Sequence, residues 1–142
     1  MAYALTKARK AVLAALQSGG PASALDLGKR LASTCDQATV YRALHFLEDA
    51  GWADSFVLRC DIRGTERYYV ARSQEHRHWL HCERCHEFVD LGACRVEPLF
   101  KEIEASLGVE IRSHTLYAAG LCRACGQELS LKTGLKPGLK PD

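Results

Sequence analysis

The hydrophobic residues near the start of the chain recur at the spacing of helices. Apolar side chains follow Thr6 on one helix face until the run Ser18-Gly19-Gly20-Pro21 interrupts the pattern. A second, shorter helix is predicted from Ser23-Ala24-Leu25-Asp26, which is typical of a capping box in which Ser23 caps the first amides. The apolar positions of these two helices are Val12, Leu13 and Leu16, then Leu25, Leu27 and Leu31.

A third helix and a hairpin are predicted next. Either Thr34 or Asp36 can cap the helix, and Gly51 offers a point at which it ends. Residues 52–58 and 66–70 are rich in β-branched and aromatic side chains, which indicates the two strands of a hairpin. Three helices followed by a hairpin is the order of a winged helix. The apolar face of the third helix is Val40, Leu44 and Leu47.

The composition changes after the polar stretch 71–75, where histidine and cysteine become frequent. We expect short strands at 79–82 and 88–91, and a helix that begins near Pro98 and ends at Gly108. A third strand is predicted over 110–120. The chain is therefore expected to be α+β, with a winged-helix domain at 1–72, a small α/β domain at 73–130 and a flexible tail at 131–142.

The composition limits the class of protein. The chain has 142 residues, of which 47% are hydrophobic and 25% charged, enough for an ordinary buried core. It has no apolar run of the roughly 18 residues that a membrane span requires and no apolar leader, so we expect a cytoplasmic protein without a membrane partner. The formal charge is +2, yet residues 1–35 alone carry +4. This basic N-terminal segment is suited to bind phosphate groups, although a helix surface exposed to solvent can carry the same charge.

Two C-x-x-C pairs are the strongest chemical signal. There are seven cysteines, an odd number that argues against a complete set of disulfides, and clustered thiols in a reducing compartment more often bind a metal. Cys82 and Cys85 form one pair, and Cys122 and Cys125 the other. Together they predict a structural zinc site of four thiolates. Ordinary buried cysteines or a redox C-x-x-C are the alternatives.

A second metal site is indicated more weakly by His76-Arg77-His78. In an extended segment the two imidazoles point to the same side, where both can reach one ion. Glu97 and His114 are further candidate ligands, but hydrophobic periodicity alone does not bring them close to His76.

The order of these motifs resembles that of the ferric uptake regulator family of bacterial metal-sensing repressors, from Thr6 to Cys125. Its zinc uptake regulator branch is the most similar. The motifs are Thr6-x-x-Arg9, Ala38-Thr39-Val40-Tyr41-Arg42-Ala43-Leu44, His76-x-His78-x-x-x-Cys82-x-x-Cys85, Glu97, and His114 followed by Cys122-x-x-Cys125.

The resemblance implies a winged helix that binds DNA, a C-terminal domain that dimerises and a four-cysteine zinc. By motif position it also implies a sensory metal site at His76, His78, Glu97 and His114. Three imidazoles and one carboxylate suit tetrahedral zinc, whereas iron sensors of this family usually have an aspartate in place of His78. An iron- or manganese-responsive regulator of the same family is the alternative.

The third predicted helix would be the recognition helix. Polar side chains near the N-terminal half of such a helix meet bases and phosphates in the major groove. The resemblance implies DNA contacts from Tyr41 and Arg42, while a solvated helix face is the alternative reading. The full set of expected DNA contacts is Arg9, Gln37, Thr39, Tyr41 and Arg42.

The chain departs from the family pattern at the other regulatory site, because Arg77 and Trp79 stand where histidines are common. Gly20 and Pro21 stand where a histidine often precedes the second helix. If that site is rebuilt, the candidate ligands nearby are Cys60, Asp61, His81 and Asp90.

These expectations describe a zinc-responsive dimeric repressor that binds palindromic operator DNA and controls metal uptake genes. A thiol redox sensor using Cys35, Cys60 or Cys94 is a rival hypothesis. A zinc hydrolase is disfavoured, because four protein ligands leave no position for water and no catalytic motif or small-molecule site is evident.

Overall fold

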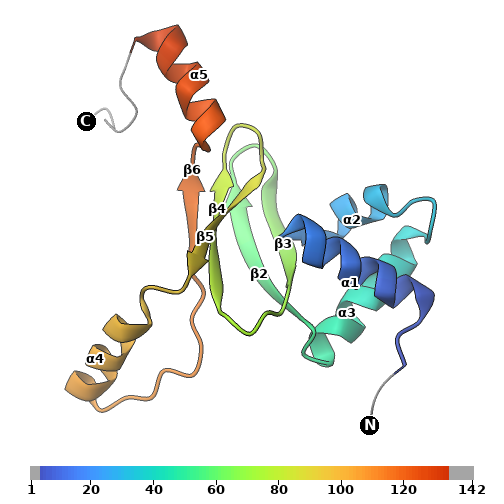
Figure 1. Cartoon of the computed structure of the whole chain (residues 1–142), viewed down its shortest axis with the longest axis horizontal. Coiled ribbons are helices and arrows are strands. Elements are labelled where there is room, and N and C mark those ends of the chain that lie inside the picture. Colours follow the sequence, from blue (N-terminus) through green and yellow to red (C-terminus); the bar gives the residue numbers. More distant parts are fainter. Residues whose placement is uncertain (1–3, 135–142) are drawn as a thin grey trace. The chain divides into compact units, whose positions relative to one another are not determined.

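The computed structural model describes residues 4–134, which form two compact units. The first extends to Gln74 and the second begins at Glu75. Figure 1 labels their helices and longer strands, and each unit is described by itself. None of the helices within residues 4–134 is long and apolar enough to span a membrane.

The first unit opens with the three predicted helices, α1 (Lys7–Gly19), α2 (Ala24–Arg30) and α3 (Gln37–Asp49). Each has a side-chain cap at its N-terminus. Thr6 accepts from the amide of Arg9, and Ser23 accepts from that of Asp26. For α3 the cap is Asp36, whose Oδ1 accepts from the Thr39 amide at 2.7 Å, and not Thr34. Capping satisfies amides that have no partner within the helix, so these residues fix where the helices begin.

The core of the first unit lies between these helices. Val12, Leu27, Val40, Leu44 and Leu47 are all fully buried. Leu25 was expected on the inner face of α2, but it is 51% exposed. With only seven residues, α2 presents a narrow buried stripe, which Leu27 occupies together with Ala24 and Gly28.

A three-stranded sheet completes the first unit. The hairpin strands β2 (Ala53–Cys60) and β3 (Gly64–Ala71) pair antiparallel, and the two-residue β1 (Ala22–Ser23) adds to the other edge of β3. The predicted order of a winged helix is confirmed.

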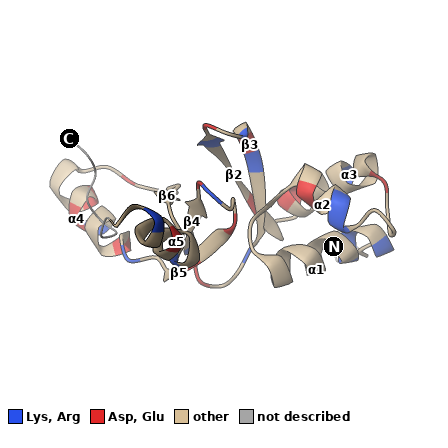
Figure 2. Ribbon diagram, turned by 90° about the horizontal axis from the view of Figure 1, so that it is seen from above, with Lys and Arg blue, Asp and Glu red and all other residues tan. Residues whose placement is uncertain are grey.

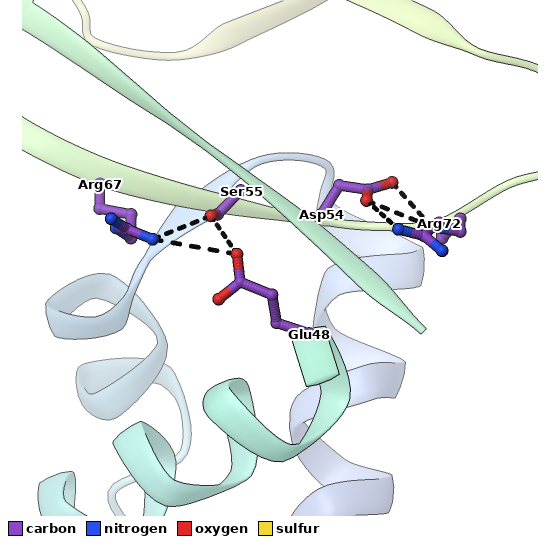
Figure 3. A network of polar contacts seen from close by, with 5 residues as sticks. All are labelled: Glu48, Asp54, Ser55, Arg67 and Arg72. Carbon is purple, nitrogen blue, oxygen red and sulfur yellow. Dashed lines mark hydrogen bonds and ion pairs between the residues drawn. The ribbon is translucent and has the colours of Figure 1, made fainter. Parts of the chain in front are cut away.

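Polar side-chain contacts join this hairpin to α3 and link the start of β2 to the residue that follows β3. Glu48 of α3 bonds with Ser55 of β2, and Arg67 of β3 donates to the same Ser55 hydroxyl at 3.2 Å (Figure 3). Nearby, the Arg72 guanidinium holds both carboxylate oxygens of Asp54. The hairpin is thereby joined to α3 as well as to its own flanking chain.

The second unit contains a three-stranded sheet and two helices. Its central strand β4 (Arg77–Cys82) pairs antiparallel with β5 (Phe88–Ala93) and parallel with β6 (Tyr117–Gly120). Helix α4 (Glu97–Leu107) lies between β5 and β6 in the chain, and α5 (Arg123–Thr133) follows β6. The sheet brings residues from both ends of this unit together along β4.

Two features of the second unit differ from the sequence predictions. The strand expected over 110–120 is formed only at Tyr117–Gly120. Helix α5 was not predicted, because its only buried residue is Cys125 and it lacks an apolar stripe. It includes the start of the predicted tail up to Thr133, and the rest of that tail from residue 135 lies outside the described residues.

Candidate metal centres and nucleic-acid interface

The four cysteines of the two C-x-x-C pairs converge on one point. Cys82 ends β4, Cys85 lies in the turn that follows, Cys122 caps α5 and Cys125 lies in its first turn. The four sulfurs lie within 4.8 Å of one another, and those of Cys85 and Cys122 are 3.8 Å apart. A tetrahedron with zinc–sulfur bonds of 2.3 Å has edges of about 3.8 Å. The parallel pairing of β4 with β6 therefore builds a cage of the size that zinc requires.

Backbone amides favour the thiolate form at one sulfur of this cage, Cys82, whereas the neighbouring thiols raise the pKa of Cys125. The amide of Cys122 donates to the sulfur of Cys82 at 3.3 Å. Burial disfavours a charged thiolate at Cys82, but amide hydrogen bonds from Cys122, Cys85 and Arg84 outweigh it and lower the pKa of Cys82 to about 6. Arg84 also pairs with Glu128 of α5 at 2.9 Å, across the same junction. All seven cysteines lie among the described residues, and none forms a disulfide.

A second cluster forms at the other end of β4. It contains the predicted His76, His78 and His114, together with Cys94. His114 Nε2 lies 3.0 Å from His76 Nε2, 3.3 Å from His78 Nε2 and 3.4 Å from Cys94 Sγ. Edges of about 3.3 Å between nitrogens and about 3.6 Å between nitrogen and sulfur follow from tetrahedral zinc with ordinary bond lengths. The four atoms thus have the spacing of a mononuclear site.

Two neighbours orient the imidazoles in this cluster. His78 is 6% exposed, and its Nδ1 lies 3.0 Å from the carbonyl oxygen of Leu116. Because a carbonyl only accepts, Nδ1 carries the proton and Nε2 presents its lone pair to the other rings. The ring of Phe100 packs on His114 with 4.7 Å between centroids. Both imidazoles are held ready to bind an ion.

The backbone register explains how Cys94 enters the cluster. Arg77 pairs with Ala93 across the β4–β5 ladder, and just beyond it the Cys94 amide donates to the His76 carbonyl at 2.8 Å. The ladder contains a bulge, and Gly92 in it has φ +86°. The carboxylate of Asp90 accepts from the Gly92 amide at 2.7 Å and so supports the bulge. Sequence reasoning did not predict Cys94 as a ligand, because a bulge changes which residues share a face.

Glu97 does not join this cluster. It is the first residue of α4, its side chain is 64% exposed and it pairs with Lys101 at 3.4 Å, one turn along the same helix. It still acts on the site at longer range. Burial lowers the pKa of His114, the neighbouring His76 and His78 act in the same direction, and the Glu97 carboxylate opposes them.

The outer face of α3 presents some of the predicted DNA contacts to solvent. Tyr41 is 47% exposed and Arg42 is exposed as well. Arg42 Nη2 donates to Thr39 Oγ1 at 3.0 Å, so these two side chains lie together. Further cations lie on α1 and on β3 of the same unit, drawn in blue in Figure 2. The outer face of α3 itself carries polar and positively charged groups of the kind that contact nucleic acid.

Two other predicted DNA contacts are engaged within the protein. The Gln37 side chain turns toward α2, where Nε2 donates to the carbonyl of Ala24 at 2.8 Å. The Arg9 guanidinium lies 3.5 Å above the centroid of the Phe46 ring, a cation–π contact between α1 and α3. Both side chains therefore help to hold the three helices together.

The residues suggested for a rebuilt second regulatory site lie in different units. Cys60 ends β2 and Asp61 follows it in the first unit, whereas His81 and Asp90 lie on β4 and β5 of the second. Asp90 pairs with Arg77 at 3.3 Å, and the buried His81 ring packs near Phe88. This site stays a prediction.

Comparison with known proteins identifies the family. The model of the ferric uptake regulator family matches residues 1–119. The chain belongs to the ferric uptake regulator family. The ferric uptake regulation protein of Vibrio vulnificus is 34% identical over 103 residues, which cover 70% of this chain and 66% of the relative, just under two thirds of its length. As a member of this family, the chain is a transcription regulator and not an enzyme.

Solved structures of the ferric uptake regulator family share the fold. The crystal structure of the Vibrio cholerae ferric uptake regulator is 30% identical, with a TM-score of 0.69 over 84% of this chain and 92% of that one. A zinc uptake regulator solved with zinc and DNA is 28% identical, with a TM-score of 0.62 over 89% of this chain and 86% of that one. The α+β fold is thus that of this family.

Proposed function

We propose that this protein is a zinc-responsive repressor that binds palindromic operator DNA as a homodimer and controls metal uptake genes. The observation that supports it best is the convergence of His76, His78 and His114 at tetrahedral spacing beside a thiol. Sites rich in imidazole suit zinc, whereas iron and manganese sites use more oxygen ligands. The similarity to a zinc uptake regulator solved with zinc and DNA supports the same reading.

The two metal centres have different roles in this proposal. Zinc at Cys82, Cys85, Cys122 and Cys125 is structural, because four thiolates close its shell and join β4 to α5. The histidine cluster is sensory. His76 lies close to the boundary between the units at Gln74 and Glu75, so fixing His76 against His78 and His114 restrains the chain where the DNA-binding unit is attached.

The free-energy coupling that this proposal requires between metal binding and DNA binding is modest. A hundredfold change in DNA affinity corresponds to about 2 to 3 kcal/mol of preference of the metal for the binding-competent form. In a homodimer, the restraint sets two copies of α3 at the separation of two operator half-sites. Arg42 and Tyr41, exposed on α3, then meet the DNA.

Metal content is the first test. After mild chelation the protein should retain one zinc per chain, and Zn(II) should restore a second. His78→Ala should retain the first zinc, keep its circular dichroism spectrum and lose the second zinc. A second equivalent restored by Fe(II) or Mn(II) but not by Zn(II) would favour the iron- or manganese-responsive alternative, which the match to ferric uptake regulation proteins supports.

DNA binding is the second test. Operators can be selected with zinc-loaded protein from a pool of random double-stranded DNA and measured by fluorescence anisotropy. Arg42→Ala should weaken binding and reduce the slope of log K against log salt by about 1. Arg112→Ala removes the same charge from an exposed position in the second unit and serves as the control. Equal binding of the two variants would overturn the assignment of α3 as the recognition helix.

A further inference from the structure

Cys94 stands among the histidines of the sensory centre in the position that a fourth ligand would take. Its sulfur lies 3.4 Å from His114 Nε2 and within 4.8 Å of the ligand nitrogens of His76 and His78. The half-buried thiol is held there by the backbone, since the Cys94 amide is bonded to the His76 carbonyl. This placement follows from the strand register and does not depend on a flexible side chain.

We propose that the Cys94 thiolate, and not the Glu97 carboxylate, is the fourth ligand, which makes the sensory centre a three-histidine, one-cysteine site for a soft divalent cation. The inference rests on the proposed function only in placing the sensory metal at these histidines. It assigns a ligand that the motifs of the sequence do not indicate.

Hydrogen bonding among the four groups alone does not account for their convergence. His114 Nε2 faces two ring nitrogens and one sulfur, all within 3.4 Å. A single proton on that nitrogen can serve only one of the three, and the hydrogen bond of His78 to Leu116 leaves its Nε2 as an acceptor. One cation at the centre satisfies all four lone pairs at once.

Glu97 is less well placed for this role. Its carboxylate is exposed and paired with Lys101, so binding the metal would require it to leave that partner. The carboxylate instead contributes negative charge near His114 from the start of α4. Its effect on a bound cation is therefore long-range and screened by salt.

A thiolate ligand has a consequence for metal choice. Soft sulfur ligands favour zinc over manganese and ferrous iron, for which carboxylate and water oxygens are better suited. A site with Cys94 as ligand should thus discriminate among the metals to which this family responds. Replacing sulfur by oxygen at this position should narrow the difference in affinity between Zn(II) and Mn(II).

Cobalt spectroscopy tests the proposal on the full-length protein. Protein that retains its four-cysteine zinc is titrated with Co(II) under anaerobic, reducing conditions, and one zinc per chain is verified after the titration. We expect a sulfur-to-cobalt charge-transfer band and tetrahedral visible bands in the wild type and in Glu97→Gln. Cys94→Ser should lose the charge-transfer band. Its zinc affinity should fall at least about 100-fold, beyond the 10- to 100-fold that loss of an outer partner typically costs.

The outcomes separate this inference from the proposed function. If Cys94→Ser keeps the wild-type spectrum and affinity while Glu97→Gln loses the second metal, the inference is overturned and the sensory site stands with its carboxylate. If His78→Ala also retains the second metal, the sensory assignment fails with it. If only the cobalt bound at the four-cysteine site gives a sulfur band, the inference fails as well.

Thiol alkylation gives a readout that does not depend on colour. Peptide mapping after iodoacetamide should show that the second equivalent of zinc protects Cys94, with Cys35 of the first unit as the internal control. Protection should disappear in His114→Ala. Alkylation of Cys94 at the same rate with and without the second zinc would overturn its assignment as a ligand.

Discussion

The side chain of Gln37 at the start of α3 lies against Gly28 of α2. A Cβ at Gly28 would meet Gln37 Oε1 at 1.8 Å, and the same amide group donates to the Ala24 carbonyl. The two helices can approach this closely because position 28 has no side chain. Gln37 therefore helps to set the position of α3 against α2 from within the protein.

This contact predicts an unusual effect of Gly28→Ala. In a helix the change normally stabilises by about 1 kcal/mol. Here that gain should be cancelled and the free energy of unfolding should stay nearly unchanged, because Gln37 must leave Ala24 and the lost hydrogen bond costs about 1 kcal/mol. Added to Gln37→Ala, however, Gly28→Ala should stabilise by about 1 kcal/mol. The parent, the two single variants and the double variant form a double-mutant cycle. Urea unfolding followed by Trp52 fluorescence in a Trp79→Phe background measures the stability of all four, and additive effects would contradict the contact.

Loss of the structural zinc should remove both metals. Cys122→Ser opens the four-cysteine cage, which joins β4 to the chain that follows β6. Without that link we expect β6 to separate from β4, and His114, just before β6, to leave the histidine cluster. Elemental analysis should find neither ion after mild chelation and return of Zn(II), and the β6 amides should exchange faster. Cys35→Ser, in the first unit, should retain both.

Acidification should weaken the sensory site. Burial and the neighbouring imidazoles lower the pKa of His114 from its ordinary value of 6.5. The folded metal-free unit therefore binds fewer protons than the unfolded chain, so the stability from this group is present above pH 6.5 and lost as the pH falls through the folded pKa.

The pH dependence of zinc affinity also distinguishes a site of three imidazoles from one that includes a thiolate. An ordinary imidazole is mostly deprotonated between pH 8 and pH 7, whereas an ordinary thiol must lose its proton to bind zinc in this range, so a thiolate ligand makes zinc affinity fall more steeply with acidification there. Competition with a chromophoric chelator at several pH values measures this slope. A flat profile down to pH 6 would contradict histidine ligation.

Arg9 and Phe46 should be energetically coupled. The guanidinium lies over the ring, and such a contact contributes about 0.5 to 1 kcal/mol. Arg9→Ala and Phe46→Leu should each destabilise the first unit, with a coupling of that size in the double variant. Because the guanidinium is already engaged, Arg9→Ala should weaken DNA binding less than Arg42→Ala does. Urea unfolding and anisotropy report the two effects separately.

Much of the first unit could be predicted from its sequence. Its helix caps at Thr6, Ser23 and Asp36 and the period of its apolar residues act locally, so they could be read without knowing the rest of the structure. The four-cysteine site could also be predicted from the sequence, because each C-x-x-C pair places two cysteines close together.

The histidine cluster could be predicted only in part, because strand pairing brings its residues together. The spacing of His76 and His78 indicated a site, but Cys94 comes from β5 through a register that the bulge at Gly92 alters. Nothing in the local sequence reports that register. Helix α5 was missed for a related reason, since Cys125 is its only buried residue and an apolar stripe is absent.

Strand β4 carries candidate ligands of both centres, with His78 in its first half and Cys82 at its end. We expect zinc in the thiolate cage to stabilise the pairing of β4 with β6 and so to favour binding at the histidines, which would set the order in which the two ions bind. In a growing cell, each newly made copy then withdraws one ion from the available pool before it can respond to that pool. The concentration of the regulator would then determine the lowest metal supply at which its target genes are repressed.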